Sequence, residues 1–276
     1  MQRLRQEDIS RWASRIDTLI GSIDNPIVRR VVVVESTPST QDSALRFARG
    51  EPGLLLVASQ QTAGRGSRGR AWDDGDRGTL PCTLVLDPGR KDAPTLAACI
   101  ACALHETLVA LPGPGCDLRI KWPNDIVVRK DASDRKLAGI LIEQRGGLTL
   151  VGIGINCNRQ GDEWPPELRD TAVSLGQLGL EVTRLDLVCR LIEHMSQWCS
   201  ACDRDQIRDY YAMHDAMVGT LRTFMHNNRC HHGVVEHLDP LGHIVVDTPA
   251  GLRHLPVTQT THKRGDGACA GDAEAE

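Results

Sequence analysis

Two kinds of apolar pattern alternate along this chain. In one, apolar residues recur three and four positions apart, which places them on one face of a helix. In the other, short runs of valine, isoleucine and leucine are bounded by turn residues, which is typical of strands. The helical pattern predicts helices over residues 9–24, 95–111, 184–199 and 205–217. A further short helix is expected after a cap at Ser39 or Thr40.

The strand pattern occurs in the segments between these helices. Strands are expected at 31–35, 54–59, 79–87, 117–122, 125–129, 136–145 and 149–158. The turn 146–148 joins the last two as an antiparallel hairpin, and the loop 130–134 precedes them. This order predicts an α+β fold, with a mixed or antiparallel sheet flanked by helices on one side.

Beyond residue 217 the pattern changes to short strands divided by Asn, Gly and Pro. These strands are expected at 219–225, 231–239, 242–248 and 251–257. Their spacing predicts a small C-terminal β-barrel. The chain therefore divides into a larger domain at 1–214, the barrel at 215–260 and a polar, Gly/Ala-rich tail at 261–276 that is predicted to be disordered.

The composition is that of an ordinary soluble globular protein, with 41% hydrophobic residues, 25% charged residues and a net charge of −4. No apolar run approaches the roughly 18–20 residues that span a bilayer, and the N-terminus, MQRLRQEDISRW, is too charged for a signal peptide. We therefore expect a cytoplasmic protein with no membrane partner. The negative net charge does not attract nucleic acid, and the segment before the first strand is too short for a helix-turn-helix, so no DNA binding is expected.

The chain contains 10 cysteines, and a protein of this length needs no disulfide framework. Four of them sit within apolar patterns and are expected to be reduced core thiols: Cys99, Cys102, Cys157 and Cys189. The motifs CIAC (99–102) and CSAC (199–202) have the spacing of metal ligands. Because both fall in predicted helices, where residues three apart simply share a face, zinc is the weaker alternative and no metal site is predicted.

The stretch GRGSRGRAW, Gly64 to Trp72, combines arginines and glycines with a tryptophan. It has the G-x-G-x-x-G spacing of a dinucleotide site, but RAWDDGDRG follows where that site needs a helix. It also lacks the Lys and Ser/Thr of a P-loop. What remains is a flexible loop whose guanidinium groups can grip a phosphate and whose tryptophan can close over an apolar ligand. The alternative is a solvated basic loop.

Three later segments carry further candidates. Lys121 leaves the strand in IKWPNDIVV beside a tight Pro-Asn-Asp turn, where it would face a cleft. Lys136 opens the strand KLAGILIE, in which Gly139 lets a ligand or another backbone approach closely, and GIGIN does the same near Asn156. Taken singly, each of these residues fits a structural role better than a catalytic one.

Taken together and in order, the segments STQ, QTAGRGSRGRAW, IKWPND, RKLAGIL and GIGIN resemble those of biotin protein ligases, in the form without an N-terminal DNA-binding domain. The resemblance covers residues 30–160 with specific motifs and the C-terminal barrel more loosely. It implies a class II synthetase-like catalytic domain that joins biotin and ATP, with Mg²⁺, into biotinyl-5′-AMP. It then implies transfer of biotin to a lysine of the biotin carboxyl carrier domain of a biotin-dependent carboxylase. The resemblance also suggests, by analogy only, a homodimer formed through the central sheet.

The resemblance also implies a role for each motif residue. Those implied in biotin binding are Ser39, Thr40, Gln41, Gln61, Gly64, Arg65, Gly66, Ser67, Trp72, Lys121 and Gly139. Those implied in nucleotide binding are Arg65, Arg68, Arg70, Trp72, Asn124, Lys136 and Asn156. The implied catalytic cations are Lys121, Arg68 and Arg70, because the carboxylate of biotin and a phosphate of ATP repel each other unless cations screen them.

Two positions depart from the family pattern. Gln41 stands where the family often has Asn, and Ser67 stands where the fourth loop position is commonly Arg. The second change removes one cation from the loop that would retain the adenylate. Faster release of biotinyl-AMP is therefore expected.

Other functions fit the same sequence less well. A lipoate or octanoate ligase shares the fold but does not ordinarily combine the arginine–glycine loop with KWPND. A non-catalytic biotin-binding relative would keep the loop but lose Lys121, which this chain keeps. A nucleic-acid-binding module ranks last, since aromatic residues make up only 3% of the chain.

Overall fold

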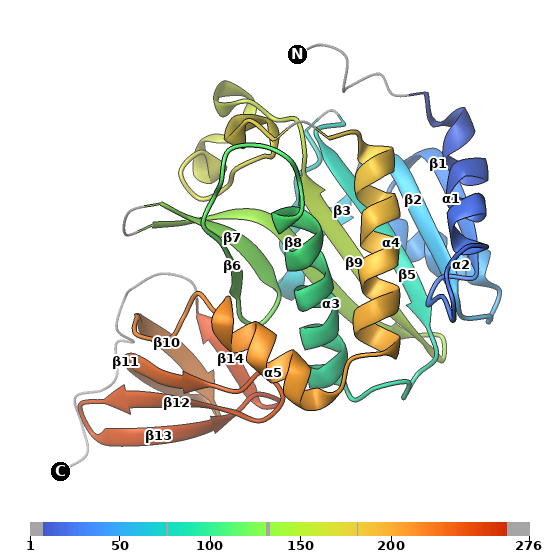
Figure 1. The fold of residues 1–276 in the computed structure, drawn as a ribbon. Coiled ribbons are helices and arrows are strands. Elements are labelled where there is room, and N and C mark those ends of the chain that lie inside the picture. The colour runs from blue at the N-terminus through green and yellow to red at the C-terminus, as the bar shows by residue number, and fades with distance from the viewer. Residues whose placement is uncertain (1–7, 76, 131–132, 181, 264–276) are drawn as a thin grey trace.

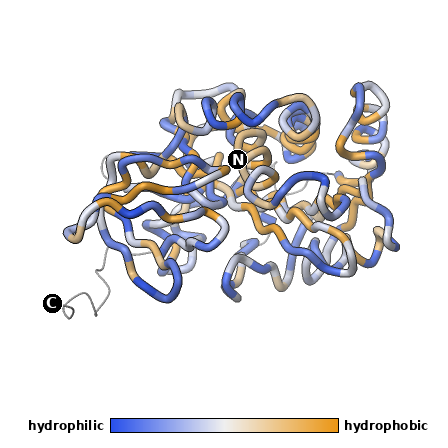
Figure 2. The backbone as a smooth tube through the Cα atoms, turned by 90° about the horizontal axis from the view of Figure 1, so that it is seen from below, coloured by the Kyte–Doolittle hydropathy of each residue, from blue (hydrophilic) through white to orange (hydrophobic). Residues whose placement is uncertain are grey.

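The computed structural model describes residues 8–75, 77–130, 133–180 and 182–263. It consists of a larger part built on a seven-stranded sheet and a smaller part built on a five-stranded sheet (Figure 1). Hydrophobic residues concentrate in the interior segments of both parts (Figure 2). None of the described helices is long and apolar enough to cross a membrane.

The seven-stranded sheet is mixed, because its first two strands run parallel and the remaining neighbours run antiparallel. The strand order is β1-β2-β5-β9-β8-β7-β6. The strands are β1 (Arg30–Thr37), β2 (Leu54–Gln61), β5 (Thr79–Leu86), β6 (Leu118–Lys121), β7 (Asp125–Lys130), β8 (Ser133–Arg145) and β9 (Leu148–Asn156). Each predicted strand is present, and β7 and β8 extend into the loop predicted at 130–134. The α+β class is confirmed.

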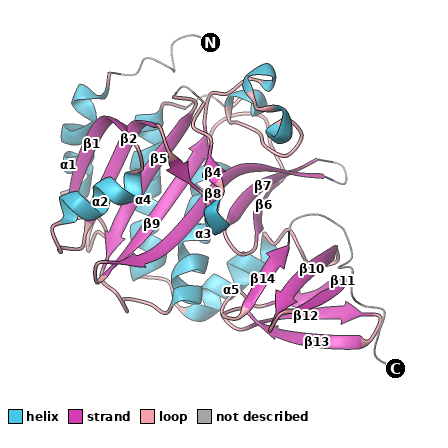
Figure 3. Cartoon of the chain, turned by 180° about the vertical axis from the view of Figure 1, so that it is seen from behind, coloured by secondary structure: helices cyan, strands magenta, loops and turns pink. Residues whose placement is uncertain are grey.

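Helices cover both faces of this sheet, whereas the sequence pattern predicted them on one face only. The helices on the face seen in Figure 1 are α1 (Trp12–Ile20), α3 (Ala93–Val109) and α4 (Arg184–Ser200). The helix α2 (Thr40–Ala48) lies on the opposite face, which is turned toward the viewer in Figure 3. Parallel neighbours such as β1 and β2 need a crossover connection, and α2 is that connection.

The strand β2 shows why both faces need a helix. Its Leu55 and Val57 belong to the larger hydrophobic core under α1, α3 and α4, and its Leu54 and Leu56 belong to a smaller core under α2. An uninterrupted apolar run of this kind is typical of a strand that is buried on both faces.

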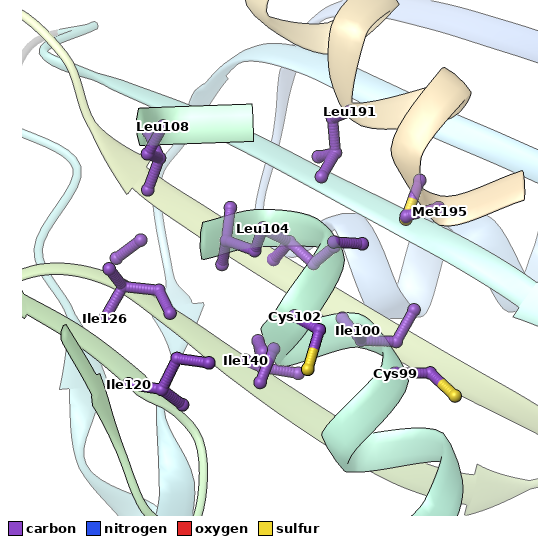
Figure 4. Close-up of a cluster of buried hydrophobic side chains, with 14 of the residues drawn as sticks. Cys99, Ile100, Cys102, Leu104, Leu108, Ile120, Ile126, Ile140, Leu191 and Met195 are labelled. Carbon is purple, nitrogen blue, oxygen red and sulfur yellow. The ribbon is translucent and has the colours of Figure 1, made fainter. Parts of the chain in front are cut away.

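The helix α3 lies at the centre of the larger core. Its Leu104 and Leu108 are fully or almost fully buried and lie between Ile126 of the sheet and Leu191 of α4 (Figure 4). Burial of each such side chain contributes about 1.5–3 kcal/mol relative to exposure. The packing of α3 therefore holds the sheet and α4 together.

The C-terminal part is an open antiparallel sheet in the order β13-β12-β11-β10-β14. Its strands are β10 (Leu221–His226), β11 (Arg229–Leu238), β12 (His243–Thr248), β13 (Gly251–Pro256) and β14 (Thr260–Lys263). The four predicted strands are present, and β14 is a fifth that begins where the tail was expected. Among the described residues no pairing joins the outer strands β13 and β14, so the sheet is not a closed barrel. The rest of the predicted tail, 264–276, lies outside the described residues.

The helix α5 spans Arg204–Met213 and ends before residue 217, where the helical pattern had placed its end. The chain after it turns to the edge of the large sheet instead. The carbonyl oxygen of His214 accepts a hydrogen bond from the backbone N–H of Ile120 at 2.8 Å, and the N–H of Ala216 donates to the carbonyl of Ile120 at 2.9 Å. This pairing with β6 ends the helix and joins the two sheets.

The cysteine prediction is largely confirmed. The free thiols among the described residues include all four, but of these only Cys99, Cys102 and Cys157 are buried in the core, and Cys189 is half-buried. Cys230 on β11 differs, because it is disulfide-bonded. No three His, Cys, Asp or Glu side chains in the described part of the chain are arranged to hold a metal ion, the two Cys-x-x-Cys motifs included.

His105 on α3 is fully buried beside β6 and α5. Its Nδ1 lies 2.9 Å from the hydroxyl of Tyr210 and its Nε2 3.0 Å from the carbonyl oxygen of Leu118, and the ring of His214 lies 4.3 Å away. Burial lowers the pKa of His105 from 6.5 to about 4, and the neighbouring His214 adds to this effect.

Stability is therefore expected to depend on pH through His105. Above pH 6.5 the folded and unfolded chains both carry a neutral imidazole, but between pH 6.5 and 4 only the unfolded chain binds the proton. The free energy of unfolding should fall by about 2 kcal/mol between pH 7 and pH 5 from this group. Urea unfolding of the wild type and of His105→Gln at both pH values measures it, with His254→Gln as the exposed control. An equally steep fall in His105→Gln would contradict the assignment.

Candidate functional site

The arginine–glycine loop folds as a small hairpin at the end of β2. The strands β3 (Gly64–Arg65) and β4 (Ala71–Trp72) pair antiparallel, and a short 3-10 turn (Ser67–Gly69) joins them. Arg68 has a φ of 60° and Gly69 a φ of 72°, so the turn uses the left-handed region. The strand β4 follows the third glycine, where a dinucleotide fingerprint needs a helix, and this confirms that the loop is not such a fingerprint.

Arg65 ties this loop to α2. Its Nη1 and Nη2 donate to the two carboxylate oxygens of Asp42 at 2.6 and 2.9 Å, and Arg145 of β8 donates to the same carboxylate at 2.6 Å. The hydrogen bond from Arg65, with that from Arg145, lowers the pKa of Asp42 to about 2. The guanidinium of Arg65 is thus a tether in this structure, and it would have to leave Asp42 to grip a phosphate.

A chain of buried polar groups lies where α2 begins. The backbone N–H and the hydroxyl of Thr40 both donate to Oε1 of Gln61, at 2.7 and 2.9 Å, and the hydroxyl of Thr83 donates to that of Thr40 at 2.9 Å. Gln41 donates through Nε2 to the carbonyl of Leu141 at 2.9 Å. Among the described residues, the buried Oε1 of Gln41 has no hydrogen-bond partner. This acceptor is therefore available to a ligand.

Trp72 lies across the glycines of β8 and β9. A Cβ atom on Gly154 would lie 2.6 Å from the indole ring, and one on Gly139 would lie 3.2 Å from it. A side chain at Gly154 would therefore clash with the ring and one at Gly139 would crowd it, so glycine at both positions favours this close packing. The indole Nε1 is buried and, among the described residues, has no acceptor.

Lys136 is the cation beneath Trp72. Its ammonium nitrogen lies 5.3 Å from the centroid of the indole ring and 2.5 Å from Oδ1 of Asp125. Asn156, which was predicted near the nucleotide, is buried and donates to the carbonyl oxygens of Lys136 and Val173, both at 3.1 Å. Asn156 therefore fixes the backbone of Lys136.

Lys121 belongs to a different ion cluster, centred on Asp134. The carboxylate of Asp134 is 3.2 Å from Lys121, 3.1 Å from Arg129 of β7 and 3.1 Å from Arg222 of β10, and it is only 7% exposed. Burial would raise the pKa of Asp134, but Lys121 and Arg129 hold it below its usual value. One carboxylate thus gathers three cations, one of which comes from the C-terminal sheet.

Arg70 stabilises the turn of the loop. Its Nε donates to the carbonyl of Ser67 at 3.2 Å and its Nη2 donates to the Ser67 hydroxyl at 3.1 Å. The neighbouring Asn124, at the end of the β6–β7 turn, donates to the carbonyl of Ile140 at 2.6 Å. Both residues therefore hold the backbone around the site as well as lining it.

These residues line three adjoining hollows. The first, of about 40 Å³, is lined by the predicted residues Ser39, Thr40, Gln41, Gln61, Arg65, Gly66, Ser67, Trp72, Asn124, Lys136 and Gly139. The second, of about 510 Å³, is lined by the predicted residues Ser67, Arg68, Arg70, Lys121, Asn124 and Lys136. The third, of about 150 Å³, is lined by the predicted residues Gly66, Ser67, Arg70, Trp72, Lys136 and Asn156. Ser67 and Lys136 line all three, so the hollows meet at these two residues.

The structure therefore brings the predicted residues together, with one exception. Gly64 lines none of the three hollows and instead pairs with Trp72 in the loop hairpin. A wider groove of about 1210 Å³ lies between α1 and α4, and it contains none of the predicted residues.

Several residues of the site were not predicted. Asp134 and Asp125 partner the two lysines, Arg222 reaches the second hollow from β10, and Asp42 tethers the loop. Asp125 and Asp134 were visible as acidic residues close to the two lysines in sequence. Arg222 is 88 residues from Asp134, and no local pattern indicates that the two meet.

Comparison with known proteins gives a consistent result. The model of the biotin/lipoate A/B protein ligase family matches residues 31–159. The biotin–acetyl-CoA-carboxylase ligase of Paracoccus denitrificans is 33% identical over 81% of this chain and 96% of its own length, and that of Mycobacterium tuberculosis is 30% identical over 84% and 87%. The structure of the biotin protein ligase from Aquifex aeolicus in complex with biotin and ATP has a TM-score of 0.71 at 22% identity, covering 85% of this chain and 99% of that one.

Proposed function

Because the chain belongs to the biotin/lipoate A/B protein ligase family, we propose that this ligase is an ATP-dependent biotin protein ligase. In the first half-reaction an oxygen of the biotin carboxylate attacks the α-phosphorus of ATP, the bond to the bridging oxygen breaks and pyrophosphate leaves. In the second, the amine of a carrier lysine attacks the carbonyl carbon of biotinyl-5′-AMP and AMP leaves. The carrier we propose is the biotin carboxyl carrier domain of a biotin-dependent carboxylase.

The observation that carries this proposal is the meeting of the three hollows at Ser67 and Lys136. An acid in the first hollow and a nucleotide in the other two would place the carboxylate and the α-phosphate at this junction. Holding two reactants in such a geometry removes much of the entropic barrier to their reaction.

The first hollow has the polar groups that a ureido ring requires. The ring offers N–H donors and a carbonyl acceptor, and the hollow offers the free Oε1 of Gln41 and the hydrogen-bonded pair Thr40 and Gln61. At about 40 Å³ the hollow is too small for a bicyclic ring while Trp72 lies across Gly139 and Gly154. We infer that the indole moves when the ligand enters and then covers it.

Lys136 is the cation best placed at the junction. It lines all three hollows, whereas Lys121, which the sequence favoured, lines only the second and is engaged by Asp134. A positioned ammonium group that meets both the carboxylate and the α-phosphate would stabilise the charge that develops between them. We therefore assign that role to Lys136, and assign Lys121, Arg68 and Arg70 to the phosphates in the second hollow.

Mg²⁺ would enter with ATP. The described residues contain no ready group of three His, Cys, Asp or Glu side chains, and Mg²⁺ is usually held by one or two carboxylates together with substrate phosphates. Asp125 and Asp134 are the carboxylates that line the second hollow beside the lysines. These residues fit a metal carried by the nucleotide, which would neutralise phosphate charge when bound.

The proposal is tested by ATP–pyrophosphate exchange with biotin, lipoate or octanoate as the acid. Exchange that depends on biotin alone is expected, because the polar groups of the first hollow suit a ureido ring better than an alkyl or dithiolane end. Exchange with lipoate or octanoate would assign the chain to the lipoate branch of the family. Absence of exchange with every acid would indicate a non-catalytic biotin-binding relative.

The assignment of the two lysines gives a second prediction. Lys136→Gln should lower the exchange rate by about 10²–10³-fold, the cost of removing one electrostatic stabiliser of a transition state. Lys121→Gln should act mainly on the KM for ATP, because that residue meets only the phosphates. Circular dichroism checks the fold of both variants. A larger loss of kcat in Lys121→Gln than in Lys136→Gln would reverse the assignment.

Ser67 gives a third prediction. The Ser67 hydroxyl at the junction accepts a hydrogen bond from Arg70 but brings no charge toward a bound phosphate. Ser67→Arg should slow the dissociation of biotinyl-AMP by at least about tenfold, since one favourable charge-assisted contact contributes about 1.5–3 kcal/mol. Rapid dilution of the preformed adenylate complex measures the rate, with Ser67→Gln as the uncharged control of similar length. Equal rates in wild type and Ser67→Arg would show that Ser67 does not set retention.

A further inference from the structure

Three histidines lie together on one face of the C-terminal sheet. His237 on β11 and His254 on β13 both pair with Val245 of β12, and directly paired residues of an antiparallel sheet point to the same face. His243 lies two residues before Val245, so its side chain points to that face as well. The ring centroids of His237 and His243 are 6.0 Å apart, and those of His243 and His254 are 5.4 Å apart.

These three rings differ from other imidazoles of the protein in the contacts that their nitrogens make with the described residues. Other imidazoles of the protein have partners: His105 bonds Tyr210 and Leu118, His194 bonds Thr107, and His232 bonds Thr223. Within the described residues, by contrast, the ring nitrogens of His237, His243 and His254 make no hydrogen bond to protein groups. His237 and His254 are exposed and His243 is half-buried, so the group faces solvent.

The spacing of His243 and His254 suits a shared metal ion. A neutral imidazole is a common ligand of divalent zinc, nickel and copper. With metal–nitrogen distances near 2.0–2.1 Å and tetrahedral angles, two rings on one metal have centroids roughly 5 Å apart. The observed 5.4 Å is close to this value, and small rotations of the two side chains would close the remaining difference.

We propose that His243 and His254 chelate a divalent transition-metal cation, such as Ni²⁺ or Zn²⁺, on the outer face of the C-terminal sheet. Water completes the coordination, because no three His, Cys, Asp or Glu side chains of the described chain are arranged around one metal position. His237, on the other side of His243, contributes less. Imidazoles bind Mg²⁺ poorly, so the site is distinct from any Mg²⁺ that enters with a nucleotide. The inference does not depend on the proposed function.

The test is calorimetric titration of the full chain with Ni²⁺, which prefers imidazole over the carboxylates of the surface. Saturable binding is expected, and His243→Ala and His254→Ala should each weaken it by at least about tenfold, since even the loss of an outer hydrogen bond costs 10–100-fold at such sites. The matched control is His226→Ala. The His226 ring also lies beside a second histidine, at 6.4 Å, but its nitrogens already face Gln259 and Asn227.

A paramagnetic readout places the ion. Bound Ni²⁺ should broaden the backbone amide signals of β11, β12 and β13 more than those of other strands in the wild type, and this selective broadening should vanish in His243→Asn. That variant also guards against a folding defect, since asparagine keeps a polar side chain at the position. Any of three results would overturn the proposal. They are a lack of saturable Ni²⁺ binding in the wild type, equal Ni²⁺ affinity in the wild type and His243→Ala, and signal broadening centred on strands other than β11, β12 and β13.

Discussion

The ion pair between Lys136 and Asp125 lies beneath the indole of Trp72, where the three hollows meet. The cleft formed by these three hollows is organised around this interaction. A cation that is largely withdrawn from water is stable only when paired and hydrogen-bonded. Asp125 supplies the charge and Trp72 the ring face, while Asn156 and the backbone N–H of Val173 hold the carbonyl oxygen of Lys136. The ammonium group is therefore fixed at the junction before any substrate arrives. Preorganisation of this kind lowers the cost of stabilising charge in a transition state.

Trp72 and its loop, which cover the cleft, are held much less firmly than Lys136 beneath them. Trp72 packs on Gly139 and Gly154, but the loop that carries it is tied to α2 mainly through Arg65 and Asp42, whose side chains are 39% and 45% exposed. Exposed ion pairs typically contribute only about 0–1 kcal/mol. The same loop turns in the left-handed region between β3 and β4, and the indole is the large apolar side chain of the described loop residues 64–72. A paired lysine beneath a tryptophan on a weakly tethered loop is compatible with the movement of the indole proposed above.

The sequence predicts a helix or strand of this fold well where the residues of that element alone determine its structure. The apolar run of β2 and the long apolar helix α3 were recognised because each is decided by its own residues. The second helical layer was missed because the run of β2 says that both faces are buried but not what buries them. The end of α5 and the strand β14 were missed for a similar reason, since residues 214–216 pair with Ile120 and β14 pairs with β10, and both are contacts between distant segments.

The site also depends on contacts between distant segments, which no local sequence pattern indicates. The motif residues were found because they lie in short segments, whereas the different roles of Lys121 and Lys136 were implied by the family resemblance and not by spacing. What separates the two lysines is the set of hollows that each one reaches, and this depends on strands β6 and β8 being aligned through β7. Gly64, which fits the motif equally well, is used for the hairpin of the loop. Similar residues in one motif can therefore have different physical roles.

The C-terminal sheet is linked to the cleft by charge as much as by packing. Arg222 joins Lys121 and Arg129 on Asp134, while Phe224 lies 6.2 Å from the ring of Trp122. A single carboxylate among three cations leaves the second hollow with a positive surplus, and one of those cations belongs to the smaller sheet. Polyphosphate bound in this hollow would therefore be attracted to both parts at once. The boundary near residue 215 divides the chain into two sheets, but the electrostatic field of the second hollow is built by both.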